Sequence, residues 1–128
     1  MKIIIQTIPS SEHRYSTCGD YWVDPDGTMQ IRVSDMKNWK YELLVAVHEL
    51  IEQNLCLDRN IKEEDISAFD IQFEKEREEG KQPDDAEPGD DPKAPYRKEH
   101  FVSTNIERIL AAELGVDWAE YDKAVMES

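Results

Sequence analysis

The chain has 128 residues, of which 29 are acidic and 15 basic, and its formal net charge is −14 at pH 7. This excess of carboxylates opposes binding to nucleic acid, because proteins bind nucleic acid largely through Lys and Arg that neutralise phosphates. A hydrophobic content of 39% in a chain of this length is enough for one modest core. We therefore predict a single domain that spans residues 1–128.

Cysteine usage and the lack of long apolar segments bear on the cellular compartment. Cys18 and Cys56 form no CxxC or other ligand spacing, which is typical of reduced thiols in a cytosolic protein. The apolar run Ile3–Ile5 is too short for a signal peptide, and no segment approaches the ~20 apolar residues that cross a bilayer. We expect a soluble, cytoplasmic protein without a membrane partner.

Three strands are predicted near the start of the chain. Ile3–Ile8 is typical of a short buried strand. Tyr21–Val23 and Thr28–Val33 are predicted to form a hairpin, because Asp24–Gly27 contains the Pro and Asp-Gly that a tight turn requires.

Four helices are predicted after the strands. Ser34 or Asp35 is the expected N-cap of a first helix that ends near Leu57. The others are expected over Ile61–Glu79, over Tyr96–Leu114, and from Asp117 onwards. Between the second and third, residues 80–95 contain four prolines and five acidic residues, which predicts a mobile loop. The fold class is therefore α+β, with a small antiparallel hairpin sheet followed by three to four helices.

The segment Val45–Gln53 carries the pattern HELIE, which places chemistry on the first helix. His48 and Glu52 are four residues apart and project from one margin of an apolar stripe, whereas Glu49 is expected to point further round, toward solvent. Two such side chains can hold one metal ion. A histidine and a glutamate one turn apart also occur as a plain hydrogen-bonded pair, and that interpretation stays open.

The donor types indicate which metal the pair would bind. A carboxylate is an acceptable zinc ligand at ~2.0–2.2 Å, but it makes a harder and more anionic site than a second imidazole would. We predict a divalent cation, with zinc favoured and manganese or iron as alternatives.

A third ligand must come from another segment. His100 is favoured, because imidazole is the better zinc ligand. Asp70 is predicted as a ligand or as a partner of one, since it falls on the apolar arc of the second helix, where an unpaired carboxylate would be costly. Glu99 is the alternative candidate for the third ligand.

The region from about Trp22 to Leu57 resembles the strand, turn, strand and active-site helix of zincin-type metallopeptidases. The resemblance implies that His48 binds metal, that Glu49 is the general base, and that a peptide or protein substrate is received at the sheet edge. It implies a zincin-like fold and metal-assisted hydrolysis of an amide. This chain has Glu52 where the family motif has histidine, so a degenerate relative is equally consistent with the pattern.

Three further resemblances or interpretations stay open. The HELxE segment followed by Pro-Gly-Asp-Asp-Pro and Ala-Pro-Tyr-x-x-Glu-His resembles small phage and prophage proteins, which implies no particular activity. Glu49 and Glu52 also match the ExxE pair of MazG-type nucleotide pyrophosphohydrolases, which bind magnesium, although Ser67 replaces the glutamate of the second pair, which would end at Asp70. A non-catalytic acidic protein would instead bind a basic partner through residues 84–91, a loop that is also placed to close over a site.

Overall fold

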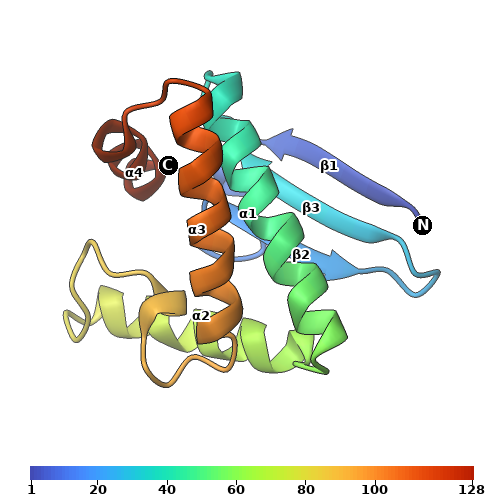
Figure 1. Cartoon of the computed structure of the whole chain (residues 1–128). Helices are drawn as coiled ribbons and strands as arrows, with labels where there is room; N and C mark the ends of the chain where they lie inside the picture. Colours follow the sequence, from blue (N-terminus) through green and yellow to red (C-terminus); the bar gives the residue numbers. More distant parts are fainter.

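The computed structural model describes all residues from 1 to 128 and contains a small sheet followed by helices (Figure 1). The strands are β1 (Ile3–Ile8), β2 (Gly19–Val23) and β3 (Met29–Ser34), in the spatial order β1-β3-β2. The predicted hairpin of β2 and β3 is antiparallel, and β1 joins the other side of β3 in parallel. The α+β prediction is confirmed, but the sheet is mixed rather than purely antiparallel because β1 runs parallel to β3.

The helices follow the sheet in the order that the sequence predicts. They are α1 (Trp39–Asp58), α2 (Glu63–Glu78), α3 (Arg97–Glu113) and α4 (Trp118–Glu127), with short 3₁₀ turns η1 (Ser10–Glu12) and η2 (Pro88–Asp90). Figure 1 shows α1 lying against the sheet and α3 running beside α1, an arrangement that their many contacts support. None of the helices is long and apolar enough to cross a bilayer.

The start of α1 differs from the prediction. Its N-cap is Asn38, whose side chain accepts hydrogen bonds from the backbone N–H groups of Lys40 and Tyr41. Ser34 and Asp35 do not cap the helix, because β3 continues through Ser34, which pairs with Ile8 of β1. The chain turns toward the helix only at Lys37, which has a positive φ of 53°.

The apolar core lies between α1 and the sheet. Ile31 and Leu44 are fully inaccessible to solvent, and Tyr121 of α4 and Ala111 of α3 extend the same cluster. Cys56 is buried in it as a free thiol. However, 12 of the 26 buried residues are polar or charged. A core of this composition needs partners for its carboxylates and imidazoles, and these concentrate between α1 and α3.

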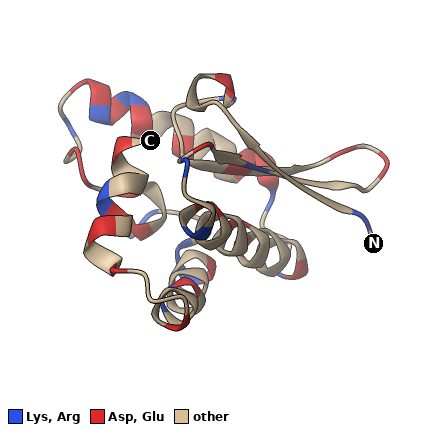
Figure 2. Ribbon diagram, turned by 90° about the horizontal axis from the view of Figure 1, so that it is seen from above, with Lys and Arg blue, Asp and Glu red and all other residues tan.

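The segment between α2 and α3 contains no strand or α-helix, in line with the sequence analysis, but it packs closely on the rest of the molecule. Gly89 of η2 is buried, and a Cβ at this position would clash with the ring of His100. Ala94 and Tyr96 belong to the core cluster. Figure 2 shows acidic residues along the helices as well as in the loops, so the acidic residues of the chain are not confined to this segment.

Candidate metal centre

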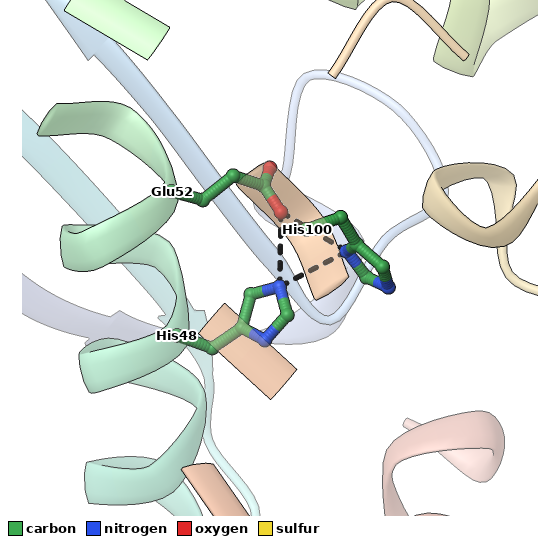
Figure 3. A group of neighbouring side chains, drawn as sticks. All are labelled: His48, Glu52 and His100. Atoms are coloured by element: carbon green, nitrogen blue, oxygen red, sulfur yellow. Dashed lines mark hydrogen bonds and ion pairs between the residues drawn. The ribbon is translucent and has the colours of Figure 1, made fainter. Parts of the chain in front are cut away.

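Three donor side chains from two helices meet at one point (Figure 3). His48 and Glu52 lie one turn apart on α1 and so project in the same direction. His100 comes from the first turn of α3, which packs along α1. All three are buried. The structure thus brings together the helical pair and the third residue that the sequence analysis favoured.

The three facing atoms form a nearly equilateral triangle. Glu52 Oε2 lies 3.0 Å from Nε2 of His48 and 3.0 Å from Nδ1 of His100, and the two nitrogens are 3.1 Å apart. Atoms this close together are within the span that one ion with bonds of ~2.0–2.1 Å could bridge. These groups could therefore hold a metal ion.

Each imidazole is also held through its other nitrogen. Nδ1 of His48 lies 2.7 Å from Oε1 of Glu107, and Nε2 of His100 lies 3.1 Å from Oε2 of Glu87 and 3.4 Å from Oδ1 of Asp90. Histidines that bind metals usually donate their second N–H to a carboxylate, which fixes the tautomer and the ring orientation. Both histidines of this centre have such a partner.

The remaining oxygens of the carboxylates are engaged as well. The Tyr21 hydroxyl donates to Oε1 of Glu52 at 2.8 Å, which leaves Oε2 facing the imidazoles. The Tyr121 hydroxyl donates to Oε2 of Glu107. Strand β2 and helix α4 therefore fix the orientation of the groups on α1 and α3, and the centre is preorganised from four elements.

The charges of the cluster shift the pKa values of its members. Burial would lower the pKa of His48, but its hydrogen bonds to Glu107 and Glu52 outweigh burial and raise the pKa to about 10. For His100, burial is outweighed by Asp90, Glu52 and Glu87, and the pKa rises to about 12. The imidazoles therefore hold protons tightly in the absence of a metal, and a metal ion must displace them.

Glu49 does not point to open solvent, so that part of the prediction is wrong. Strand β2 covers this side of α1, and Glu49 is half-buried in the cavity beside the triad. Gly19 makes room for it: a Cβ there would lie 2.8 Å from Glu49 Oε1. Burial, together with the nearby charge of Glu52, raises the pKa of Glu49 well above its usual value.

Asp70 lines the same cavity but is not one of the three converging donors. Its carboxylate is buried and accepts hydrogen bonds from the Tyr15 hydroxyl at 3.0 Å and from the Tyr96 hydroxyl. Burial raises its pKa to about 7, despite those hydrogen bonds. Glu99 lies elsewhere, paired with Arg59 at 2.6 Å, so this alternative candidate is not at the centre.

The centre opens into a cavity of about 270 Å³. Helices α1 and α2, strand β2 and the segment around η2 all contribute to its wall. Glu49 and Asp70 therefore line the same cavity as His48, Glu52 and His100. A molecule of a few non-hydrogen atoms fits beside the three converging donors.

The edge of β2 that borders this cavity is already hydrogen-bonded to side chains. Asp20 accepts from the backbone N–H of Tyr21, Arg14 donates to the Tyr21 carbonyl, and Glu63 accepts from the N–H of Val23. Thr17 donates to the carbonyl of Gly19 at 2.7 Å. Strand addition by a peptide needs free backbone groups at such an edge. The structure thus differs from the open sheet edge that the zincin resemblance implies.

Several residues of the centre were absent from the sequence analysis. Glu107 could have been found, because it lies seven residues after His100 and therefore on the same face of α3. Glu87 and Asp90 carry no such signal, since they lie outside regular helix and strand, and neither does Tyr21.

Comparison with known proteins identifies no relative of this chain. No protein-family model, curated protein or solved structure matches the chain.

Proposed function

We propose that this protein is a metal-dependent hydrolase, zincin-like or a degenerate relative of such peptidases, with the ion held by His48, Glu52 and His100. One observation carries the proposal. The three donor atoms converge within 3.1 Å of one another, while the outward atoms of all three side chains are held by other residues. Plain surface pairs do not need this second layer of partners.

The donor set favours zinc. Two imidazoles and one carboxylate are the ligands of several catalytic zinc sites, which keep a further position for water. The same donor set with open positions also serves iron(II), and a carboxylate suits manganese, so these metals are the alternatives. Asp70 lines the cavity but is not assigned as a ligand.

Glu49 is assigned as the general base. Zinc, when bound, supplies Lewis acidity and lowers the pKa of a coordinated water. Glu49 lies in the same cavity and its raised pKa suits a group that accepts a proton and then gives it to a leaving amine. The bond attacked would be an amide in a peptide or related substrate.

A magnesium-dependent nucleotide pyrophosphohydrolase is supported less well. Glu49, Glu52 and Asp70 do line one cavity, as that alternative requires. However, Glu52 is turned toward two imidazoles, which magnesium does not use, and Ser67 contributes no carboxylate. The non-catalytic alternative, an acidic binding protein, has no use for a buried set of converging donors.

Elemental analysis tests the ligand assignment. Protein purified without a polyhistidine tag or chelator should contain about one zinc, manganese or iron ion per chain, and His48→Ala should lose it. His13→Ala is the matched control, because His13 lies outside the centre and contacts Ser34. Equal metal content in wild type and His48→Ala would refute the site.

A second variant tests catalysis separately from binding. Glu49→Gln should keep the ion but lose hydrolysis of fluorogenic aminoacyl amides by about 10²-fold or more. Glu64→Gln, an exposed position on α2, should change neither property. Unchanged turnover in Glu49→Gln would remove the base from the mechanism, and magnesium-dependent hydrolysis of nucleoside triphosphates would favour the pyrophosphohydrolase instead.

A further inference from the structure

The cavity beside the centre has an unusual charge balance. Its wall includes a single Arg, Arg77, and no Lys. Against this cation stand nine carboxylate side chains, those of Asp20, Glu49, Glu52, Glu63, Asp70, Glu74, Asp84, Glu87 and Glu107. The imidazoles of His48 and His100 also line the cavity and are cationic in metal-free protein, but each is already paired with carboxylates. A cavity whose wall carries a large excess of one sign of charge attracts a ligand of the opposite sign.

The terminal nitrogens of Arg77 are already engaged, and only its buried Nε has no hydrogen-bond partner. Its guanidinium donates to the carbonyl of Asp84 at 2.5 Å, to the carbonyl of Ala86, and to Glu74 at 3.1 Å. These contacts tie α2 to the segment before η2. A phosphate or carboxylate entering the cavity would therefore meet no Arg or Lys with a free terminal nitrogen, and the imidazoles that it would meet are already paired with carboxylates.

Asp70 and Glu49 are the two cavity carboxylates best placed to receive a cation. Neither takes part in a salt bridge. Asp70 is 8% exposed, and its two hydrogen bonds come from the neutral hydroxyls of Tyr15 and Tyr96. A carboxylate so deeply buried is costly without a counter-charge, and a bound cation would supply it.

The geometry also limits the size of the ligand. The cavity measures about 270 Å³, which is at the lower end of the pockets that hold small molecules. An extended peptide cannot add to β2, because its outward backbone groups are occupied by Arg14, Asp20, Glu63 and Thr17. The space thus suits a compact molecule rather than a polypeptide strand.

We infer that the cavity binds a small cationic substrate, whose ammonium or guanidinium group pairs with Asp70 while its amide lies toward His48, Glu52 and His100. The inference rests on the proposed hydrolase for the reaction, but not for the binding of the cation. Asp70 is then a specificity residue, and Tyr15 and Tyr96 position its carboxylate. Small amides that carry a primary amine or a guanidinium are the substrate class.

Binding of three probes of equal length tests the inference. Isothermal titration calorimetry on the protein as purified measures its affinity for n-butylamine, n-butanol and butyrate. These three compounds differ in charge but hardly in size. The amine should bind at least about tenfold more tightly than the alcohol, the effect of roughly one charge-assisted hydrogen bond, and butyrate should bind most weakly.

Asp70→Asn keeps the shape of the side chain and removes its charge. This variant should lose the preference for the amine while its zinc content stays at the wild-type level, and Asp85→Asn, in the exposed loop, should keep the preference. Equal binding of the three probes by wild type, or a preference that survives in Asp70→Asn, would overturn the inference. So would a second ion per chain that Asp70→Asn loses, because Asp70 would then be a metal ligand.

The two proposals fail in different measurements. A protein without a His48-dependent ion but with an Asp70-dependent preference for the amine would refute the hydrolase and support the cation site. A stoichiometric ion without any preference for the amine would do the reverse.

Discussion

Asp70 offers the sharpest prediction about stability, because it is a buried carboxylate without a cationic partner. Burial raises its pKa from 3.8 to about 7 in the folded protein. The folded state therefore binds the proton of the Asp70 carboxyl group more tightly than the unfolded state does. Protonation of Asp70 stabilises the fold fully below pH ~4, and this stabilisation is lost as pH rises through ~7. We therefore expect Asp70→Asn, which cannot ionise, to be the more stable form at high pH.

The size of the effect follows from the shift. A difference of about three pKa units corresponds to ~4 kcal/mol at most, since each unit is worth 1.36 kcal/mol. Relaxation of the cavity and entry of water reduce that figure. We therefore expect the free energy of unfolding of Asp70→Asn, relative to wild type, to be ~2–4 kcal/mol higher at pH 8 than at pH 4. The histidine cluster is present in both proteins, and its own titration therefore largely cancels in the difference.

Urea unfolding of metal-free protein measures this difference. The free energies of unfolding of wild type and Asp70→Asn are compared from pH 4 to pH 8, with Asp85→Asn as the control. The control removes a carboxylate that is exposed in the folded protein, and so reports the effect of an Asp-to-Asn substitution outside the cavity. A flat profile for Asp70→Asn would mean that Asp70 is ionised at little cost in the folded state, and would refute the argument from burial.

Three more variants or conditions test other parts of the centre. Glu107→Gln should weaken zinc binding about 10–100-fold by removing the carboxylate at Nδ1 of His48. The control Glu113→Gln, on the exposed face of α3, should not weaken it. Equal zinc affinities of Glu107→Gln and wild type in a chelator competition would contradict this prediction. Gly19→Ala should lower the free energy of unfolding measured with urea by ~1–3 kcal/mol, because the added Cβ would lie 2.8 Å from Oε1 of Glu49. The variant should also lower turnover without loss of metal. Full turnover would show that Glu49 has room to move. Metal affinity should rise with pH as the two imidazoles lose their protons. Calorimetric titration in buffers of different ionisation enthalpy should detect the release of these protons on metal binding. An affinity that is independent of pH from 6 to 9 would exclude His48 and His100 as ligands.

Local periodicity allowed part of the centre to be predicted. His48 and Glu52 follow from helical spacing alone, since residues four apart project from one face. The prediction that Glu49 points to solvent is wrong, because spacing on an isolated helix does not show that β2 packs over that side. The position of Glu49 depends on Gly19, and sequence offers no way to foresee that this glycine lies against α1.

Long-range packing decided the rest. His100 was favoured for the chemistry of imidazole, whereas its arrival beside α1 depends on how α3 packs, which no short pattern specifies. Asp70 was singled out correctly as a carboxylate on an apolar arc, but its partners Tyr15 and Tyr96 lie far from it in the sequence. Glu87 belongs to a loop for which the sequence suggests a basic partner or closure over a site, and only the three-dimensional structure places it at His100.

The composition of the core argues that the centre is more than a by-product of an acidic sequence. A chain of net charge −14 gains nothing in stability from burying carboxylates, and replacing a buried charged cluster by apolar residues is commonly neutral or stabilising. Here Glu52 and Glu107 are buried all the same, and two imidazoles and two tyrosine hydroxyls satisfy them. An arrangement that fixes four side chains in one geometry, without a gain over apolar packing, is explained when a cation binds there, because metal binding then adds free energy to the folded state.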